Sequence, residues 1–214
     1  NLTHADEYGY HNLPLCIIDA VFSIGVKYQS TENSVKRFCE YFGITRLREK
    51  VLAPQTYQLA VSAFIQFHQD FTFQEMAEKV YQNKQRTSTR NGILKAEAAY
   101  RFASVVQKFG VEYIQNVEKI LGNAAFEAEI ARIPGQSSGL STRYFYMLAG
   151  DENFIKPDRM IRRFIDSAIH RELSFDECQE LLVSAHAELV REYPPLTPRS
   201  LDHQIWLYQR AVNE

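Results

Sequence analysis

The sequence predicts an all-α protein of about ten helices. Apolar residues recur at helical spacing along almost the whole chain, no convincing alternation of apolar and polar residues marks a strand, and capping residues recur between the apolar segments. With 214 residues, 45% of them hydrophobic, the chain is long enough for one large domain or for two lobes that share a core.

The helices expected before the central polar loop cover residues 15–26, 32–43, 54–69 and 72–83. The first is mostly apolar, which indicates a buried helix. Ser30 or Thr31 is expected to cap the second helix, and Gly43 is expected to end it. Thr72 is followed three residues later by Glu75, which is the signature of a capping box at the start of the fourth helix.

After the polar loop at 84–92, the helices expected cover residues 93–110, 111–122, 123–133, 140–150, 159–171, 175–193 and 199–212. The segment 93–110 has a strong amphipathic pattern. Ser174 is expected to cap the helix that follows it, and the proline-rich residues 194–198 separate that helix from the last one.

Composition narrows the possible classes of protein. The longest apolar runs are far shorter than the roughly 20 residues that cross a bilayer, and nothing at the start resembles a signal peptide. Cys16, Cys39 and Cys178 are widely spaced and odd in number, so reduced, buried thiols in a cytoplasmic protein are expected. No spacing of histidine, cysteine or carboxylate residues suggests a metal site.

The charges are unevenly distributed. A net charge of −2 argues mildly against a nucleic-acid partner. However, residues 84–108 contain six Lys or Arg and only Glu97 as an acid, and residues 132–163 contain six Lys or Arg against three Asp or Glu. A basic face is consistent with this distribution, and so are solvated helix surfaces that have no partner.

Residues 133–139, with the sequence IPGQSSG, form the most specific motif. Gly135 and Gly139 stand in a polar turn between two expected helices, where a missing Cβ lets backbone N–H groups approach a ligand. The next helix, from Leu140, directs its positive end toward the same place. This combination suits a phosphate of a nucleic-acid backbone, although an ordinary helical hairpin uses the same turn residues.

Asp158 follows Pro157 and opens the next helix. Aspartate is a favoured N-cap that stabilises a helix by about 1 kcal/mol. A carboxylate fixed near bound nucleic acid is also suited to stabilise the sugar cation that forms as a glycosidic bond breaks, and to orient a water molecule.

The order of helix, IPG…G hairpin, helix LSTRYFYMLAG, KPD and helix RMIRRF resembles the helix-hairpin-helix DNA glycosylase superfamily. The upstream ILKAEAAYRFASVV also resembles the helix that precedes the hairpin in endonuclease III-like and alkylbase members. The resemblance covers about residues 13–170. It implies a two-lobed fold, with a middle lobe of residues 31–149 that ends in the hairpin, a second lobe of residues 1–30 plus 150–214, and double-stranded DNA in the cleft between them.

Residue by residue, the resemblance makes Asp158 the catalytic aspartate. It places in contact with DNA Gly135, Gln136, Ser137, Ser138, Gly139, Ser141, Lys156, Arg159, Arg163, Tyr28 and Gln29. The position of the lysine that forms a Schiff base in bifunctional members holds Gly139 or Ser141 here, so a monofunctional hydrolase that needs no cofactor is expected. The hairpin lacks the usual Gly-x-Gly, and the cysteine cluster of iron–sulfur members is absent.

Several residues have two interpretations. Tyr144 and Tyr146 line a base pocket or pack in the core, and Tyr28 either intercalates in DNA or is a core aromatic. The loop QRTSTR either contacts phosphates or is simply solvated. Asp19, within the apolar CIIDAVF, is either a functional buried acid or hydrogen-bonds a helix end.

The rival functions are a non-catalytic DNA-binding protein of the same fold, in repair or defence, and a helical protein–protein adaptor. If the source is bacterial, a DNA-binding function implies a protein associated with the nucleoid.

Overall fold

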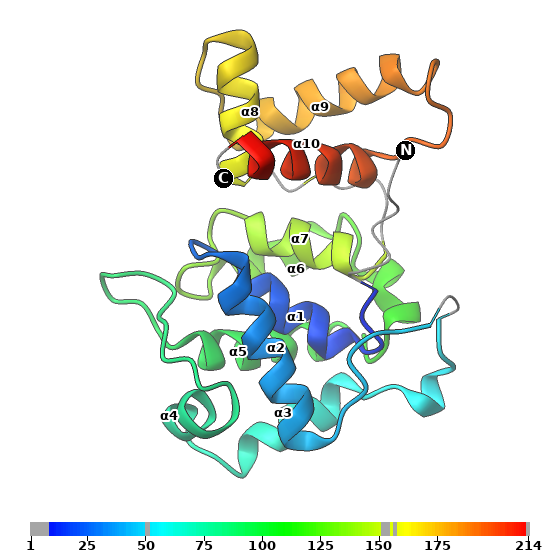
Figure 1. Ribbon diagram of the computed structural model, residues 1–214. Coiled ribbons are helices and arrows are strands. Elements are labelled where there is room, and N and C mark those ends of the chain that lie inside the picture. Colours follow the sequence, from blue (N-terminus) through cyan, green and yellow to red (C-terminus); the bar gives the residue numbers. More distant parts are fainter. Residues whose placement is uncertain (1–8, 50–51, 151–154, 156–157, 213–214) are drawn as a thin grey trace. The chain divides into compact units, whose positions relative to one another are not determined.

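The computed structural model describes residues 9–49, 52–150, 155 and 158–212, and every regular element among them is a helix (Figure 1). Extended pairing in these residues is confined to two isolated bridges, between Tyr10 and Leu47 and between Arg86 and Leu94. The expected all-α fold is therefore confirmed.

The helices are, in chain order, α1 (Leu13–Phe22), α2 (Tyr28–Phe42), the 3-10 helix η2 (Gln55–Tyr57), α3 (Val61–Gln69), α4 (Phe73–Glu75), the π-helix η3 (Met76–Val80), α5 (Lys95–Lys108), the 3-10 helix η4 (Ile114–Lys119), α6 (Ala124–Ala131), α7 (Leu140–Leu148), α8 (Arg159–Ile169), α9 (Phe175–Leu189) and α10 (Pro198–Val212). None of the helices in the part of the chain that the structure describes is long and apolar enough to cross a membrane.

The chain divides into two compact units, and the larger one is Tyr8–Ala149. Its centre is α1, in which every residue is buried and which packs against α2, α3, α5 and α7 (Figure 1). The expected second lobe combined residues 1–30 with the end of the chain, so the described residues 9–30 were assigned to the wrong unit. The reason is physical: α1 has no polar face, and the surrounding helices of the larger unit cover it on all sides.

The described residues from Gly150 onward belong to the smaller unit, which has a small core of its own. Helix α10 packs across α8 and α9. The buried residues of this core are Ile155, Ile161, Ile165, Leu173, Cys178, Leu182 and Ile205. Cys16, Cys39 and Cys178 are all buried free thiols, as expected from their spacing.

Several helix ends differ from the expected ones. Helix α2 starts at Tyr28, and its N-cap Lys27 makes no side-chain cap, so Ser30 and Thr31 lie inside the helix and do not cap it. Gly43 ends α2 in the left-handed conformation, as expected. The capping box of Thr72 and Glu75 is also confirmed, but the helix that it starts widens into η3 after one turn.

The helix expected over 54–69 is broken between η2 and α3. The break is fixed by two backbone groups that bond to distant parts of the chain. Leu59 N donates to Asn12 Oδ1 at 2.7 Å, and Val61 N donates to Glu112 O at 3.1 Å. Because the backbone is extended at the break, both N–H groups reach these acceptors. In a continuous helix the same N–H groups would point along the helix and away from them.

His68 lies in the aromatic part of the core, where it is 2% exposed. Its Nδ1 donates to Phe64 O at 2.9 Å, so the neutral ring accepts at Nε2 from Tyr81 Oη, 3.3 Å away. Burial lowers the pKa of His68 from its ordinary value of 6.5 to about 4. The imidazole is therefore neutral in the folded protein at neutral pH.

Lowering the pH from 7.5 to 5 is expected to reduce the free energy of unfolding by about 2 kcal/mol through His68. The folded-state pKa lies below the unfolded one, so the unfolded chain binds more protons between them. The stabilisation is complete above the unfolded pKa and is lost as the pH falls toward the folded one. Urea unfolding at both pH values measures the loss, and His68→Gln is expected to lose about 2 kcal/mol less than the wild type on acidification. Equal losses would contradict this role.

Candidate nucleic-acid interface

The motif at residues 132–139 forms the turn between α6 and α7. Backbone bonds from Gln136 N to Ile133 O at 2.9 Å and from Gly139 N to Gln136 O at 3.2 Å close two successive tight turns. Gly135 and Gly139 have φ values of 84° and 72°, in the region that favours glycine. Gly139, the N-cap of α7, provides no side-chain cap, and Ser138 Oγ accepts a hydrogen bond from Leu140 N at 3.4 Å.

A second loop, residues 83–94, packs against this turn. It is held as a narrow hairpin by bonds from Thr87 N to Ile93 O and from Lys95 N to Gln85 O, both 2.9 Å. A Cβ added at Gly135 would lie 2.5 Å from Thr87 Cβ. This close approach fixes the two loops against each other and explains why the position holds glycine.

A third loop, which joins α1 to α2, lies beside the second. Lys95 is 2% exposed, and its Nζ donates to Phe22 O and Ile24 O, both at 2.8 Å. These carbonyls are at the C-terminal end of α1, where a positive charge is stabilised by the helix dipole. At the start of α2, Ser30 Oγ accepts from Gln85 Nε2 at 3.3 Å. Lys95 and Gln85 therefore anchor the third loop to the second.

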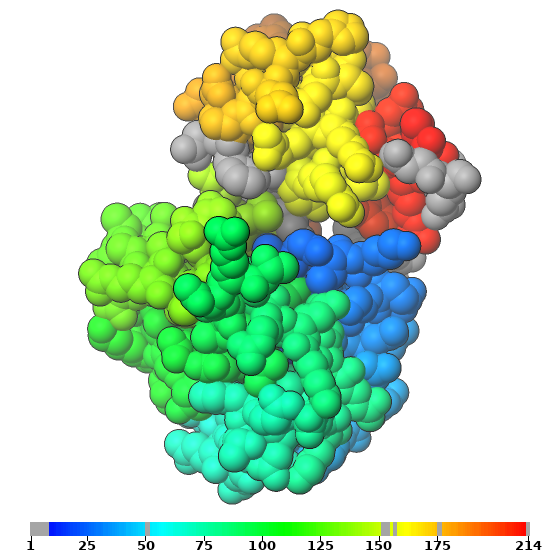
Figure 2. Space-filling view, turned by 90° about the vertical axis from the view of Figure 1, so that its left-hand side faces the viewer, coloured from blue at the N-terminus to red at the C-terminus, as the bar shows by residue number. Residues whose placement is uncertain are grey.

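We call residues 23–30, 83–94 and 132–139 together the loop face. Figure 2 shows them side by side on one face of the larger unit, coloured blue, green and yellow-green. These segments contain no Asp or Glu, and their five basic residues are Lys27, Lys84, Arg86, Arg90 and Arg132. Lys84 forms an ion pair with Glu78 at 2.7 Å, and Arg86 Nη1 donates to Gly92 O at 2.6 Å. The loop face is therefore a locally basic surface on a chain of slightly negative net charge.

The predicted contact residues of the turn divide into buried and exposed ones. Ser137 and Ser138 are exposed. Gln136 and Ser141 are each 1% exposed. Within the described residues, Gln136 Oε1 and Ser141 Oγ have no hydrogen-bond partner. The backbone of this turn and its serines, and not the Gln136 side chain, are therefore the groups that face outward.

Asp158 is the N-cap of α8. Its Oδ1 accepts from Met160 N at 2.7 Å and from Ile161 N at 3.2 Å, so the capping interpretation is confirmed. The two bonds also fix the direction of the carboxylate. Arg159 and Arg163 follow on the same helix and are exposed, whereas Lys156 lies outside the described residues. Asp158 and the two arginines are in the smaller unit, and the loop face is in the larger one.

Of the two tyrosines predicted for a base pocket, Tyr146 is part of the core. It is fully buried, its Oη donates to Ile120 O at 2.8 Å, and its ring packs beside Phe126 and Phe145. Its assignment to a pocket was wrong, because both ring and hydroxyl are already satisfied by the protein. Tyr144 is half-buried on the same helix.

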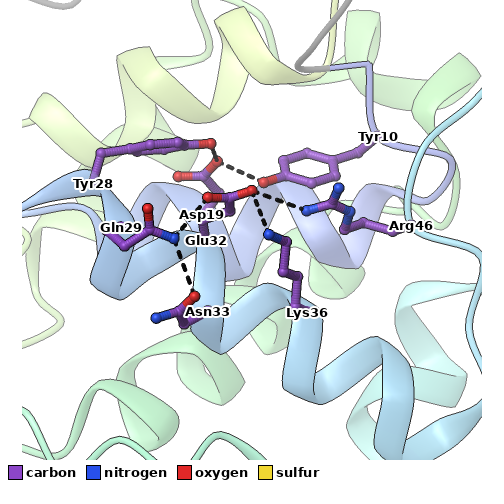
Figure 3. A network of polar contacts seen from close by, with 8 residues as sticks. All are labelled: Tyr10, Asp19, Tyr28, Gln29, Glu32, Asn33, Lys36 and Arg46. Atoms are coloured by element: carbon purple, nitrogen blue, oxygen red, sulfur yellow. Dashed lines mark hydrogen bonds and ion pairs between the residues drawn. The ribbon is translucent and has the colours of Figure 1, made fainter.

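Tyr10 and Tyr28 bond to Asp19, and Tyr144 interacts with Tyr10. Asp19 Oδ2 accepts from Tyr10 Oη at 2.8 Å and from Tyr28 Oη at 3.4 Å (Figure 3). Burial first, then the charge of Asp19, and then the neighbouring phenols of Tyr28 and Tyr144 raise the pKa of Tyr10 far above its ordinary value. Tyr10 therefore remains a hydrogen-bond donor. We call these four residues the Asp19 cluster.

The position of Tyr28 does not support its assignment as an intercalating residue, because its hydroxyl is directed to Asp19. Its neighbours differ. Lys27 and Gln29 are exposed, and Gln29 Nε2 donates to Glu32 and Asn33, one turn further along α2 (Figure 3). Glu32 is held in turn by Lys36 at 2.8 Å and by Arg46 at 3.4 Å, which lower its pKa.

No group of three or more histidine, cysteine or carboxylate side chains is arranged to hold a metal ion in the part of the chain that is described. The exposed polar side chains of the loop face include hydroxyls and cations, which are groups that bind phosphate.

The fold and the loop face define an all-α protein whose helical hairpin is exposed within a basic surface. The chain belongs to the family described as a domain of unknown function, DUF8548, whose model matches residues 1–210. No curated protein and no solved structure matches the chain.

Proposed function

We propose that the chain binds double-stranded DNA through the loop face. The observation that supports this is that three neighbouring loops without a single acidic residue lie beside the exposed serines, Ser137 and Ser138, that precede α7. Cations and helix N-termini bind phosphate oxygens without reading the base sequence. The contact is therefore to the DNA backbone, with affinity that falls as salt is raised.

The reaction that we propose is hydrolysis of the N-glycosidic bond of a damaged or modified base. Its support is the resemblance of the hairpin, the KPD segment and helix α8 to helix-hairpin-helix glycosylases, in which an aspartate at this place stabilises the sugar cation. The N-cap geometry of Asp158 suits this task, because two backbone N–H groups hold one oxygen and keep the carboxylate in one orientation. The aspartate also orients the attacking water.

The binding step is tested with two variants of equal charge change. Lys27→Gln, Arg90→Gln and Arg132→Gln together remove three cations from the loop face. Lys36→Gln, Lys79→Gln and Lys108→Gln remove three cations that pair with carboxylates elsewhere on the same unit. Duplex affinity is measured between about 50 and 200 mM salt. The loop-face variant is expected to lower the slope of log affinity against log salt by about 3, and the control variant to change it little. Equal changes would refute binding through this face.

The chemical step is tested on duplexes that contain uracil, alkylated purines or oxidised bases, with abasic sites as the readout. Wild type is expected to form abasic sites, and Asp158→Asn is expected to lose this activity. Asparagine is as good an N-cap as aspartate, so this variant keeps the helix intact and separates catalysis from capping. A thermal melt confirms that the variant is folded.

The second candidate function is a DNA-binding protein without catalysis, and the capping role of Asp158 favours it. In this case the loop-face variant loses salt-dependent binding as above, while the wild type releases no base from any duplex.

A further inference from the structure

Asp19 is the feature of the larger unit that the proposed DNA contacts leave unexplained. Helix α1 is fully buried, and Asp19 is the one charged residue in it. Moving a carboxylate from water into a protein interior is unfavourable by several kcal/mol unless partners compensate. An apolar residue would have continued the pattern of this helix, so the acid is a candidate for a function.

The surroundings of Asp19 are suited to a planar, polar ligand. Two phenols from separate elements bond to the carboxylate, Tyr10 before α1 and Tyr28 at the start of α2, and the phenol of Tyr144, on α7, interacts with that of Tyr10. Aromatic rings provide faces on which a base stacks. The carboxylate provides an acceptor at its edge. These are the two kinds of group that recognise a base taken out of a duplex.

Tyr28 is the weaker of the two donors that reach Asp19 Oδ2. Its bond is 3.4 Å long, against 2.8 Å for the bond from Tyr10. A hydroxyl-to-oxygen hydrogen bond is usually about 2.7–2.8 Å long, so the contact from Tyr28 contributes little. Tyr28 is half-buried and follows directly on the loop face, at a helix start that has no side-chain cap. Displacing this phenol would open Asp19 Oδ2 from the side of the loop face.

We propose that Asp19 determines base specificity by accepting a hydrogen bond from the exocyclic amino group of an extruded base, with Tyr28 turning aside. This inference rests on the proposed function and specifies its substrate class. An ionised carboxylate only accepts hydrogen bonds, so it attracts an amino group and repels a keto oxygen. The favoured bases are those of the cytosine, adenine or guanine type that carry an amino group, over the corresponding keto bases.

Matched bases test this directly. 5-Hydroxycytosine and 5-hydroxyuracil differ at one position of the ring, where the first has an amino group and the second a keto oxygen. Adenine and hypoxanthine differ in the same way among the purines, so duplexes that carry each of the four bases are compared. Base release is measured with the wild type, and affinity is measured in an Asp158→Asn background that holds the base without the chemical step. Wild-type recognition is expected to favour the amino member of each pair by between about 5-fold and 150-fold.

Asp19→Asn is expected to reverse this preference, because the amide places an N–H donor where a keto oxygen would bind. A role in folding alone would lower release of all bases equally and would not reverse their order. Tyr28→Phe removes a hydroxyl from the same carboxylate and is expected to keep the amino preference. Melting temperatures confirm that each variant is folded.

The outcomes separate this inference from the proposed function. The inference is supported if the affinity is higher for the amino bases and Asp19→Asn reverses this preference. This holds even if the wild type releases no base and the proposed reaction fails. Base release with the same amino-to-keto ratio in wild type and Asp19→Asn would overturn the inference and leave the proposed reaction standing. Salt-dependent binding with no dependence on the base would also overturn it.

Discussion

Replacing Lys95 by methionine is expected to lower the free energy of unfolding by about 4 kcal/mol. Hydrogen bonds that involve a charged group are worth about 1.5–3 kcal/mol each, and Lys95 Nζ makes two of them, to Phe22 O and Ile24 O. Methionine fills a similar volume but donates nothing, so both carbonyls at the end of α1 lose a partner. Urea unfolding followed by circular dichroism measures the effect.

The control for this prediction is Lys108→Met. Lys108 Nζ pairs with Glu129 at 2.6 Å, but its side chain is 63% exposed, so its loss is expected to change stability by less than about 1 kcal/mol. A Lys95→Met protein as stable as the Lys108→Met protein would show that the buried ammonium does not stabilise the junction of α1 with its loop.

Replacing Gly135 by alanine is expected to lower the free energy of unfolding by about 3 kcal/mol. Two effects add. The residue has a φ of 84°, which is strained for any residue with a Cβ, and the new Cβ would lie 2.5 Å from Thr87 Cβ. The turn or the second loop must move to relieve this overlap. Duplex binding by the loop face is therefore expected to weaken along with stability.

Gly139→Ala is the matched control, because the two glycines share a turn and a similar φ. Gly139 has a φ of 72°, but nothing lies within 4 Å of an added Cβ. The control reports backbone strain alone, about 1 kcal/mol. Unfolding curves that show equal losses for the two variants would mean that contact with Thr87 does not constrain the turn.

Helix content could be predicted because it depends on local pattern. The capping box of Thr72 and Glu75 and the end of α2 at Gly43 are fixed by residues within one turn of each other, and both were predicted. The break before α3 could not be predicted. It depends on acceptors at Asn12 and Glu112, which are distant in sequence and leave no mark in the local pattern.

The candidate site was predicted in part. The turn at 132–139 has glycines with positive φ at both expected positions, and Asp158 caps its helix. The contact of Thr87 with Gly135 was missed, because no periodicity relates two loops. One signal was present for Lys95: it lies between the buried Leu94 and the buried Ala98 and Ala99 of α5, where a surface lysine does not belong.

The Asp19 cluster shows the same limit. Asp19, Tyr28 and Tyr144 were predicted to have three separate roles, whereas in the structure Tyr10 links them: Tyr10 and Tyr28 bond to Asp19, and Tyr144 interacts with Tyr10. Whether residues of different helices meet depends on how α1, α2 and α7 pack against one another. The spacing of apolar residues within each helix does not specify this packing.

The anchoring of α1 by Lys95 has an evolutionary consequence. Both acceptors are main-chain carbonyls, which every amino acid possesses, so the side chains at positions 22 and 24 can drift without weakening this bond. Selection to keep these two bonds therefore acts on position 95 alone, because only a long cationic side chain there can reach both oxygens.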